Sequence, residues 1–422
     1  MTGNQASLAR AALPAPKAAA AHWDRVRKET ARYAVLLLGG AAAAVLAMAM
    51  PAMASPISVH DAAGTASISP ILGDNDIVTG VRGTTDGNVI LTGSRGNADG
   101  TRNTKPFLYE GPLTRAAKSV SVLTPPFPGF ETGTFYGPDT NTYNPDTIPA
   151  GQVRAVGSYR TWPNNGVFNH GMIYRGPVNG PDGQWTTIDV PRDGSNTVGH
   201  VRACPITRPG CFVMDTIAHS TMGNLVVGNY DLNPSVRGVI TANAFIYNMS
   251  THLWTLLRLG GSMSSATTLY GIWQNGGPGS PNYTLAGGSS AHGSSLRTQR
   301  AFLMNYNERT GVFGKPRFYS YGNTPTLFTH FDGITKVQGG FNLVAVSSAQ
   351  PSSMAFVPTT GGNWPSFGTA TWHPIDVAAS QVCSATCTRV TGNTVYQNQV
   401  MGLYLKQSHG KPRTYLATVP TP

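Results

Sequence analysis

The feature that most constrains the fold is a five-residue phrase, usually with a central glycine, that recurs six times along the chain. The copies are VTGVR from Val78, FYGPD from Phe135, IAHST from Ile217, LYGIW from Leu269, FDGIT from Phe331 and VTGNT from Val390. Recurrence of one phrase at long intervals is the signature of a repeat architecture, in which each copy marks one structural unit. The chain is therefore expected to combine six similar units.

Each copy is followed by segments that alternate apolar with small or polar residues, which is the periodicity of β-strands. The second segments are VILTGSR from Val89, VRAVGSY from Val153, LVVGNY from Leu225, YTLAGGSS from Tyr283, NLVAVSS from Asn342 and QVMGLYL from Gln399. The third segments are PFLYEG from Pro106, GMIYRG from Gly171, AFIYN from Ala244, AFLMNY from Ala301, MAFVP from Met354 and RTYLATV from Arg413. The fourth segments, often opened by Trp, are SVSVL from Ser119, WTTIDV from Trp185, WTLLRL from Trp254, RFYSY from Arg317 and WHPIDV from Trp372.

Six copies of a four-stranded unit predict an all-β fold, a six-bladed β-propeller that forms a single domain over residues 55–422. The sixth copy lacks a fourth strand because the chain ends at Pro422. We expect the stretch TASISPIL, Thr65 to Leu72, to supply that strand and so to close the open edge of the last blade. A β-solenoid would need a shorter and more regular repeat, and two packed β-sandwiches would not repeat a four-strand phrase.

The N-terminal 54 residues have the pattern of a secretory signal peptide. Basic residues, among them Arg27, Lys28 and Arg32, lead into an apolar run from Tyr33 to Met50, and Ala52-Met53-Ala54 offers a cleavage site. The run is close to membrane-spanning length, so an uncleaved anchor is the alternative. Either way, we expect the rest of the chain to lie outside the cytoplasm, secreted or periplasmic, as a monomer.

The charge and composition of the chain limit the classes of partner that it is expected to bind. Glycine (49) and proline (31) are abundant and only 12% of residues are charged, a balance typical of short strands joined by tight turns. Beyond residue 54, 24 Lys and Arg face 17 Asp and Glu, a net charge of +7. The basic residues are scattered and form no phosphate track, so nucleic-acid binding is not expected.

The four cysteines form two tight pairs, Cys204 with Cys211 and Cys383 with Cys387. In an exported chain such pairs predict two local disulfides. A four-thiolate zinc site is the alternative, but the two spacings are poor matches to the usual zinc knuckles.

The third segments AFIY and AFLM, with second segments that end in Gly, a small residue and Tyr, resemble the HAF-type extracellular repeats of exported bacterial proteins. The resemblance spans most of the chain from Ile77 to Pro420 and departs from that pattern before Ala-Phe, where Asn243, Arg300 and Met354 replace the histidine. What it implies is a secreted repeat protein, with no particular activity.

No sequence motif of a known enzyme mechanism is present. The chain lacks a G-x-S-x-G elbow, an H-E-x-x-H zinc motif and a phosphate-binding glycine loop, so no named hydrolase family is supported. Asp-Gly and Asn-Gly pairs are expected to be hairpin turns rather than calcium loops. The one short acidic pair, Asp74 and Asp76, is the candidate calcium site, and no other cofactor is expected.

The innermost strands carry the candidate catalytic residues because they line the central channel of a propeller. Alignment of the six copies places His219 at the position that is glycine elsewhere, and Tyr136 and Tyr270 at the position before it. In the fifth copy, THFDG, His330 and Asp332 alternate onto one strand face. The two disulfide loops precede opposite blades, so we expect them to hold the rim of the channel mouth rigid.

Two functions fit these residues. In the first, the imidazole plugs the channel and the protein is an exported scaffold that binds a glycan, an envelope component or a protein through its loop face. In the second, a secreted hydrolase or lyase uses His219 or His330 as a base or metal ligand, with Asp332, Tyr136 and Tyr270 as partners. Isolated histidines in strands are more often structural, so the binding function is favoured.

Overall fold

The computed structural model describes residues 58–61, 72, 75–96, 103–113, 120–163, 167–180, 182–204, 206, 210–233, 242–259, 266–290, 299–325, 328–377, 387, 389–405 and 412–420. The chain divides between Met53 and Ala54 into two units, and all of these residues belong to the second. The predicted signal peptide lies outside them. Among the described residues, no helix is long and apolar enough to cross a membrane.

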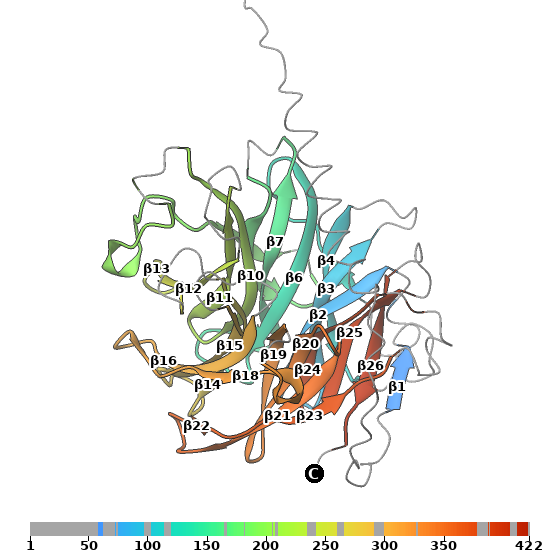
Figure 1. The fold of residues 1–422 in the computed structure, drawn as a ribbon. Helices are drawn as coiled ribbons and strands as arrows, with labels where there is room; N and C mark the ends of the chain where they lie inside the picture. The colour runs from blue at the N-terminus through green and yellow to red at the C-terminus, as the bar shows by residue number, and fades with distance from the viewer. Residues whose placement is uncertain are drawn as a thin grey trace, which may run out of the picture. The chain divides into compact units, whose positions relative to one another are not determined.

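Six small antiparallel sheets form the blades of the predicted six-bladed propeller (Figure 1). Blade 1 consists of β2 (Asp76–Gly83), β3 (Val89–Gly96), β4 (Thr104–Gly111) and β5 (Ser121–Val122). Blade 2 consists of β6 (Phe130–Thr140), β7 (Gln152–Thr161), β8 (His170–Pro177) and β9 (Gln184–Ile188). Blade 3 consists of β10 (Val213–Met222), β11 (Leu225–Leu232), β12 (Asn243–Asn248) and β13 (Leu253–Leu257).

The remaining blades repeat this order with split or borrowed outer strands. Blade 4 consists of β14 (Thr267–Asn275), β15 (Asn282–Ser289) and β16 (Arg300–Asn307), with β17 (Val312–Phe313) and β18 (Arg317–Tyr319) both paired to β16. Blade 5 consists of β19 (Thr329–Val337), β20 (Gly340–Ser347) and β21 (Ser353–Thr360), with β22 (Ser366–Phe367) and β23 (Thr371–Pro374) both paired to β21. Blade 6 consists of β24 (Arg389–Tyr396), β25 (Gln399–Leu405), β26 (Pro412–Thr418) and β1 (Ser58–Asp61).

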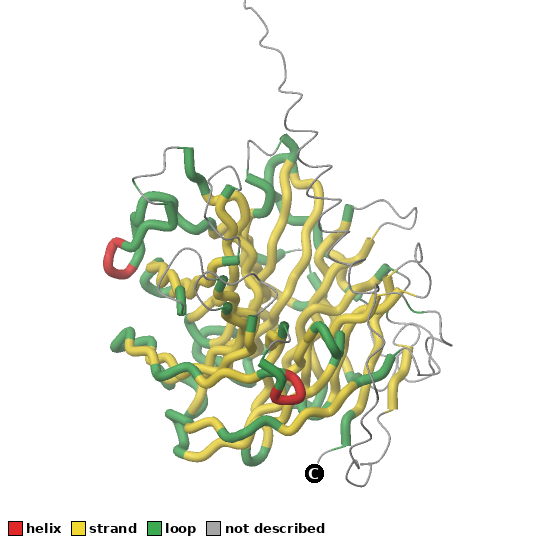
Figure 2. Tube along the Cα trace, viewed as in Figure 1, coloured by secondary structure: helices red, strands yellow, loops and turns green. Residues whose placement is uncertain are grey.

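Strands dominate the described chain, and its only helical segments are the short turns η1 (Val198–His200) and η3 (Tyr321–Asn323) (Figure 2). The first strands β2, β6, β10, β14, β19 and β24 contact one another in sequence, and β24 returns to β2. The ring is therefore closed around an axis lined by the repeated five-residue phrase. We call the face on which these inner strands begin the top face.

The closing strand comes from the N-terminal side as predicted, but not from the predicted stretch. Strand β1 pairs antiparallel with β26, with Ser58 opposite Thr418 and Asp61 opposite Tyr415, and the two lie side by side in Figure 1. A strand ending at Leu72 would leave three residues before β2. Fully extended, these reach about 14 Å, which only equals three strand spacings and leaves no slack for turns. The predicted TASISPIL, apart from Leu72, lies outside the described residues.

The blades are held together by apolar side chains buried between neighbouring sheets. The Trp that opens an outer strand stacks on the Phe of its own inner strand, with ring centroids 5.5 Å apart for Trp185 and Phe135 and 6.1 Å apart for Trp372 and Phe331. This contact explains why the repeat pairs an aromatic in its first segment with a Trp in its fourth.

The glycine of the repeated phrase is required by the close approach of neighbouring blades. A Cβ atom on Gly80 would lie 2.1 Å from the backbone oxygen of Tyr136 in the next blade. A Cβ on Gly137 would lie 2.7 Å from the backbone oxygen of His219, again one blade further on. Because no side chain fits at these distances, the glycines let the inner strands crowd around the axis.

Candidate functional site at the propeller axis

Every inner strand contains a register shift of one residue against its neighbour, which is the mark of a β-bulge. Within the repeated phrase one residue is skipped in each blade, and these residues are Thr79, Tyr136, His219, Tyr270, Asp332 and Asn393. A bulge re-aims the side chain that it carries. Five of the six residues, all except Asn393, line one small cavity on the axis. The Asn393 side chain bonds to the neighbouring blade.

This register corrects the alignment made from the sequence. His219 does not occupy the glycine position; it is the counterpart of Tyr136 and Tyr270, and Ser220 occupies the glycine position of blade 3. In blade 6 the bulge residue is Asn393 rather than Thr391. An alignment on glycine differs from the structure by one residue in blade 3, where Ser220 stands in place of glycine, and by two residues in blade 6, where Thr394 does. The histidine is thus one of six side chains directed at the axis by the same backbone device.

The rings of blades 2 to 5 follow one another around the axis in contact. Tyr136 and His219 have ring centroids 4.9 Å apart, His219 and Tyr270 4.6 Å apart in an edge-to-face arrangement, and Tyr270 and His330 5.2 Å apart. His330 Nε2 lies 2.8 Å from Asp332 Oδ1, which confirms that these two residues share a strand face. All five candidate catalytic residues predicted from the sequence therefore meet at the axis.

Hydrogen bonds link blade 6 to blade 1 and blade 1 to blade 2 in the same layer. The Asn393 side-chain amide donates to the backbone oxygen of Val78 at 2.8 Å, and the Thr79 hydroxyl donates to the backbone oxygen of Phe135. Both acceptors directly precede the bulge of the next blade. The bulge side chains of blades 6 and 1 therefore each bond to the next blade, and with the rings of blades 2 to 5 they form a layer across the channel.

A second layer below the first is built around Arg82, the last residue of the first repeated phrase. Its guanidinium donates to the backbone oxygens of Ile272 at 2.9 Å and Ile334 at 3.2 Å, and lies over the Trp273 ring at 5.1 Å. The side chain thus crosses the axis from blade 1 to blades 4 and 5. Burial lowers the pKa of Arg82, and the nearby carboxylate of Asp139 opposes this shift.

Asp139 anchors a buried charge network beside this layer. Its carboxylate accepts from Arg154 at 3.0 Å, from the Asn144 amide at 2.8 Å and from the Gly223 backbone N–H at 3.1 Å. Burial raises the pKa of Asp139, while Arg154 and Arg82 act in the opposite direction. The sequence did not lead us to predict a role for Arg82 or Asp139. The available signal was that each is a charged residue at the last position of a repeated phrase that is otherwise uncharged.

The two layers leave little free space on the axis. In the cavity between them, the space that the centre of a water molecule can occupy is about 20 Å³. A cavity needs roughly 10–15 Å³ of such space to hold one water. A sugar or an ester group does not fit such a space. The axial side chains can therefore meet one or two waters but no substrate without a rearrangement of the inner strands.

Burial also fixes the protonation of these groups. Burial, helped by the neighbouring His330, lowers the pKa of His219 to about 3. Burial raises the pKa of Tyr136 and of Tyr270, and for Tyr270 the Asp332 carboxylate adds to the rise. At neutral pH the ring layer consequently contains a neutral imidazole and two neutral phenols. His219 cannot serve as an acid, and it is a weak base.

A carboxylate pair near the top of blade 3 was not predicted. Asp215 and Asp231 are opposite each other on β10 and β11. Burial raises the pKa of Asp231 to about 6, with a further rise from Asp215 and an opposing hydrogen bond from the Ala242 backbone N–H. Burial also raises the pKa of Asp215. The main cause is burial of both carboxyl groups in the assembled sheet, which the sequence alone does not reveal.

Of the two candidate calcium residues, only Asp76 is among the described residues. Both oxygens of Asp76 accept from the Arg95 guanidinium, at 2.7 and 2.6 Å, and Asp74 lies outside the described residues. Among those residues, no group of three or more His, Cys, Asp or Glu side chains is arranged to hold a metal ion.

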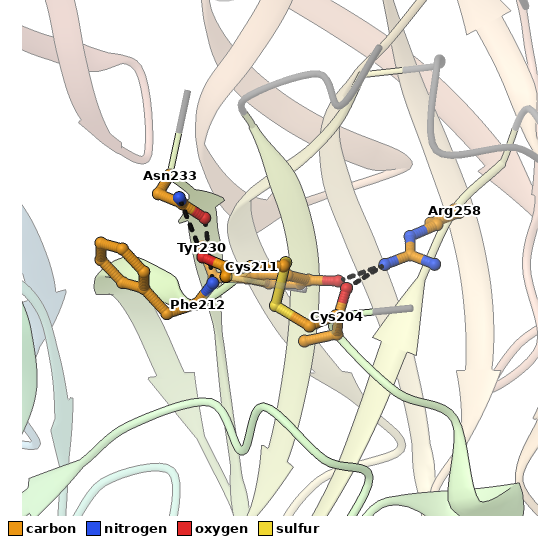
Figure 3. Close-up of a disulfide and its surroundings, with 8 residues drawn as sticks. Cys204, Cys211, Phe212, Tyr230, Asn233 and Arg258 are labelled. Carbon is orange, nitrogen blue, oxygen red and sulfur yellow. Dashed lines mark hydrogen bonds between the residues drawn. A yellow bond between two sulfur atoms is a disulfide. The ribbon is translucent and has the colours of Figure 1, made fainter. Parts of the chain in front are cut away.

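The predicted disulfide between Cys204 and Cys211 is present, with Cα atoms 5.6 Å apart. Figure 3 shows it beside Tyr230, whose hydroxyl accepts from Arg258 at 2.8 Å. Thr197, seven residues before Cys204, forms a β-bridge with Trp254 on the outermost strand of blade 3, and residues 205 and 207–209 inside the disulfide loop lie outside the described residues. Cys387 is also disulfide-bonded, and Cys383 lies outside the described residues.

Fold and site together define a six-bladed β-propeller whose axis is closed by two layers of side chains. No model of a known protein family matches the chain, and no curated protein matches its sequence. Solved structures of similar fold include a GH93 α-L-arabinofuranosidase of Fusarium graminearum in complex with arabinobiose, with 9% identity, a TM-score of 0.44, and coverage of 86% of this chain and 97% of that one.

Two further similar structures belong to proteins of other kinds. A virginiamycin B lyase from Staphylococcus aureus has 10% identity and a TM-score of 0.35, covering 86% of this chain and 100% of that one. An exo-β-1,3-galactanase from Phanerochaete chrysosporium has 11% identity and a TM-score of 0.35, covering 78% and 80%. At these identities and TM-scores the similarity gives no information about activity or ligand.

Proposed function

We propose that the protein is an exported β-propeller scaffold that binds a glycan, an envelope component or a protein through its loops. The observation that carries this proposal is the closed axis. The side chains that would act in a central catalytic site contact one another and leave room for about one or two waters. The surface left for a ligand is then the loop-bearing face and the rim of the blades.

The chemistry of His219 supports the same conclusion. An efficient general base has a pKa near the working pH, whereas burial lowers the pKa of His219 to about 3. Its ring instead fills the gap between Tyr136 and Tyr270. The role that fits these contacts is to pack the centre of the ring and hold blades 2, 3 and 4 in register.

An extracytoplasmic location is part of the proposal. It is supported by the signal-peptide pattern of residues 1–54 and by the disulfide between Cys204 and Cys211, since disulfides persist mainly in oxidising compartments. In this proposal the protein acts as a monomer without a metal cofactor, and its partner is a component of the cell envelope or its surroundings.

A screen of the purified protein against immobilised glycans and envelope fractions, run beside a panel of chromogenic glycosides and esters, tests the proposal. We expect saturable binding to at least one glycan or envelope component, and no turnover of any compound in the panel. His219→Phe, which keeps a ring between the two tyrosines, should bind as the wild type does. Turnover that disappears in His219→Phe while binding persists would overturn the scaffold function.

The second candidate, a secreted hydrolase or lyase, is favoured by one observation, the carboxylate pair of Asp215 and Asp231. A carboxyl group with a pKa of about 6 holds a proton for part of the time near neutral pH, as a general acid must. Paired carboxylates are also the usual equipment for cleaving glycosidic bonds. In this alternative the reacting group is Asp231 rather than His219.

Asp231→Asn distinguishes the alternative from the scaffold. If the protein is a hydrolase, this variant should lose at least about a hundredfold in turnover, because general acid catalysis contributes on that scale. Asp189→Asn, which removes a half-exposed carboxylate on the same face, is the matched control and should retain full turnover. Equal turnover by both variants would eliminate Asp231 as the reacting group.

A further inference from the structure

A groove lies between the outer edge of blade 4 and blade 5, and none of the axial residues belongs to its lining. It has a volume of about 300 Å³, and Arg300, Arg317, Ser320, Asn323 and Thr369 contribute its polar lining. This volume reaches the lower end of the range for small-ligand sites in proteins. Its lining combines two guanidinium groups with neutral hydroxyl and amide groups and contains no carboxylate.

The two arginines are held in place without being neutralised. The Arg300 guanidinium stacks over the Phe318 ring at 4.6 Å. Arg317 donates to the backbone oxygen of Phe367 and, at 3.4 Å, to the Thr369 hydroxyl. A guanidinium has five N–H donors, so both side chains keep donors to spare. Among the described residues, no carboxylate forms a salt bridge with either arginine.

The surrounding strands add to the positive charge. Residues 299–325 contain four basic residues, Arg300, Arg309, Lys315 and Arg317, and a single acidic residue, Glu308. The Glu308 carboxylate already accepts two hydrogen bonds, from the Asn248 amide at 2.8 Å and from the Tyr283 hydroxyl at 3.1 Å. The edge of blade 4 therefore presents preoriented, uncompensated donors, which is the arrangement that recognises an oxyanion.

We propose that this groove binds an acidic polysaccharide, with Arg300 and Arg317 each pairing with a carboxylate or sulfate group along the sugar chain. Ser320, Asn323 and Thr369 supply the neutral hydrogen-bonding groups that neighbouring sugar hydroxyls require. The groove favours a glycan over an acidic peptide because its lining offers hydroxyls and an amide beside the charges. The inference rests on the proposed binding function and adds to it the class of ligand and the place where it binds.

Calorimetric titration of the purified protein with trigalacturonate, at low and at physiological salt, tests this site. The neutral control is the methyl-esterified trisaccharide, which has the same sugars without the charges. We expect the acid to bind at least about tenfold more tightly than the ester, and to bind more weakly as salt rises. Equal affinities for acid and ester would overturn the proposal, as would the absence of binding by both trigalacturonate and a sulfated tetrasaccharide at millimolar concentration. Preference between these two acids tells a carboxylate from a sulfate ligand.

Variants locate the binding to the groove. Arg300→Gln and Arg317→Gln should each weaken trigalacturonate binding about tenfold, and Lys315→Gln, which removes the same charge from the adjacent exposed position, should weaken it less than twofold. Arg300 makes no hydrogen bond within the described residues, so Arg300→Gln tests the site even if Arg317→Gln fails to fold. Equal losses of trigalacturonate affinity in Lys315→Gln and Arg300→Gln would show that binding depends only on the general surface charge, and would refute the site.

The remaining outcomes separate this inference from the proposed function. Binding of a neutral glycan that is unchanged in Arg300→Gln would refute the acidic-glycan site and leave the scaffold function standing. Binding of hexaglutamate more tightly than trigalacturonate, lost in Arg300→Gln, would replace the glycan by an acidic peptide. Turnover of trigalacturonate by the wild type would contradict the scaffold function itself.

Discussion

Replacement of His219 by phenylalanine should make the protein more resistant to acid. Phenylalanine keeps an aromatic ring in contact with Tyr136 and Tyr270, whose centroids lie 4.9 and 4.6 Å from that of the imidazole. It removes only the ability to take up a proton. In the folded protein burial lowers the pKa of His219 to about 3, against an ordinary value of 6.5, so the unfolded chain binds this proton more readily than the folded one.

The sign and size of the effect follow from that difference. A histidine with a lowered pKa in the folded state gives its full contribution above pH 6.5 and loses it as the pH falls toward 3. One pH unit within that window costs about 1.36 kcal/mol, so at pH 4.5 the wild type has lost about 3 kcal/mol of unfolding free energy through His219 alone. For roughly 370 folded residues, this corresponds to about 4 °C in Tm.

Thermal unfolding of wild type and His219→Phe, measured side by side from pH 8 to pH 4.5, gives the test. We expect similar Tm values at pH 8 and a lead of about 4 °C for the variant at pH 4.5. His200→Asn, which removes an exposed histidine away from the axis, is the control, and its curve should run parallel to that of the wild type. A gap between wild type and His219→Phe that stays constant across this range would refute the assignment of a neutral imidazole with a lowered pKa.

Three further substitutions test other parts of the ring. Gly80→Ala should lower stability by about 1–3 kcal/mol, the usual cost of overpacking, because its Cβ would lie 2.1 Å from the Tyr136 backbone oxygen; an unchanged Tm would contradict the required close approach. Asp139→Asn should cost about 3–5 kcal/mol in the free energy of unfolding, since it leaves Arg154 buried without its partner; a loss below about 1 kcal/mol would show that the pair is not needed. Asp231→Asn should stabilise the protein by about 1–3 kcal/mol at pH 8 but not at pH 3.5, because a pKa raised to about 6 means that only the ionised carboxylate destabilises the folded state. Thermal unfolding at both pH values measures this, and equal effects at the two would exclude the Asp231 carboxylate as the source of the pH dependence.

The number and order of the blades could be predicted because the sequence repeats the features that the fold needs most. Glycine recurs where neighbouring inner strands nearly touch, as at Gly80 and Gly137. A Trp recurs where the outer strand covers the inner Phe, as for Trp185 on Phe135. These are local requirements with a fixed place in each unit, so the amino-acid pattern states them directly.

The exact equivalence of the axial residues could not be predicted for all blades. In blade 3 a serine stands where blades 1, 2, 4 and 5 have glycine, and only the strand register shows that His219 corresponds to Tyr136. The second axial layer is also invisible in the pattern, because Arg82 reaches the Ile272 backbone 190 residues away once the ring has closed. Contacts of this kind form only in the assembled ring. In the sequence they are visible only as a single charged residue within a phrase that is otherwise uncharged.

The closing strand illustrates a third kind of limit. Several N-terminal segments alternate in the manner of a strand, and the choice between them depends on how far the linker to β2 must travel. The selected segment, Ser58–Asp61, leaves 14 residues before Asp76, enough to cross the blade with turns at both ends. Chain length, rather than strand propensity, decides which segment pairs with β26.

The central claim is that the axis is a packed, closed element and that function belongs to the outer surfaces. A nitrogen-15 NMR titration of the His219 imidazole tests this claim most directly, because it reports the protonation of the one group at the centre of the ring. We predict that the imidazole stays neutral from pH 8 down to about pH 4. A midpoint near 6.5 would contradict the claim, since it would mean that the axis is open to water and available for acid–base chemistry.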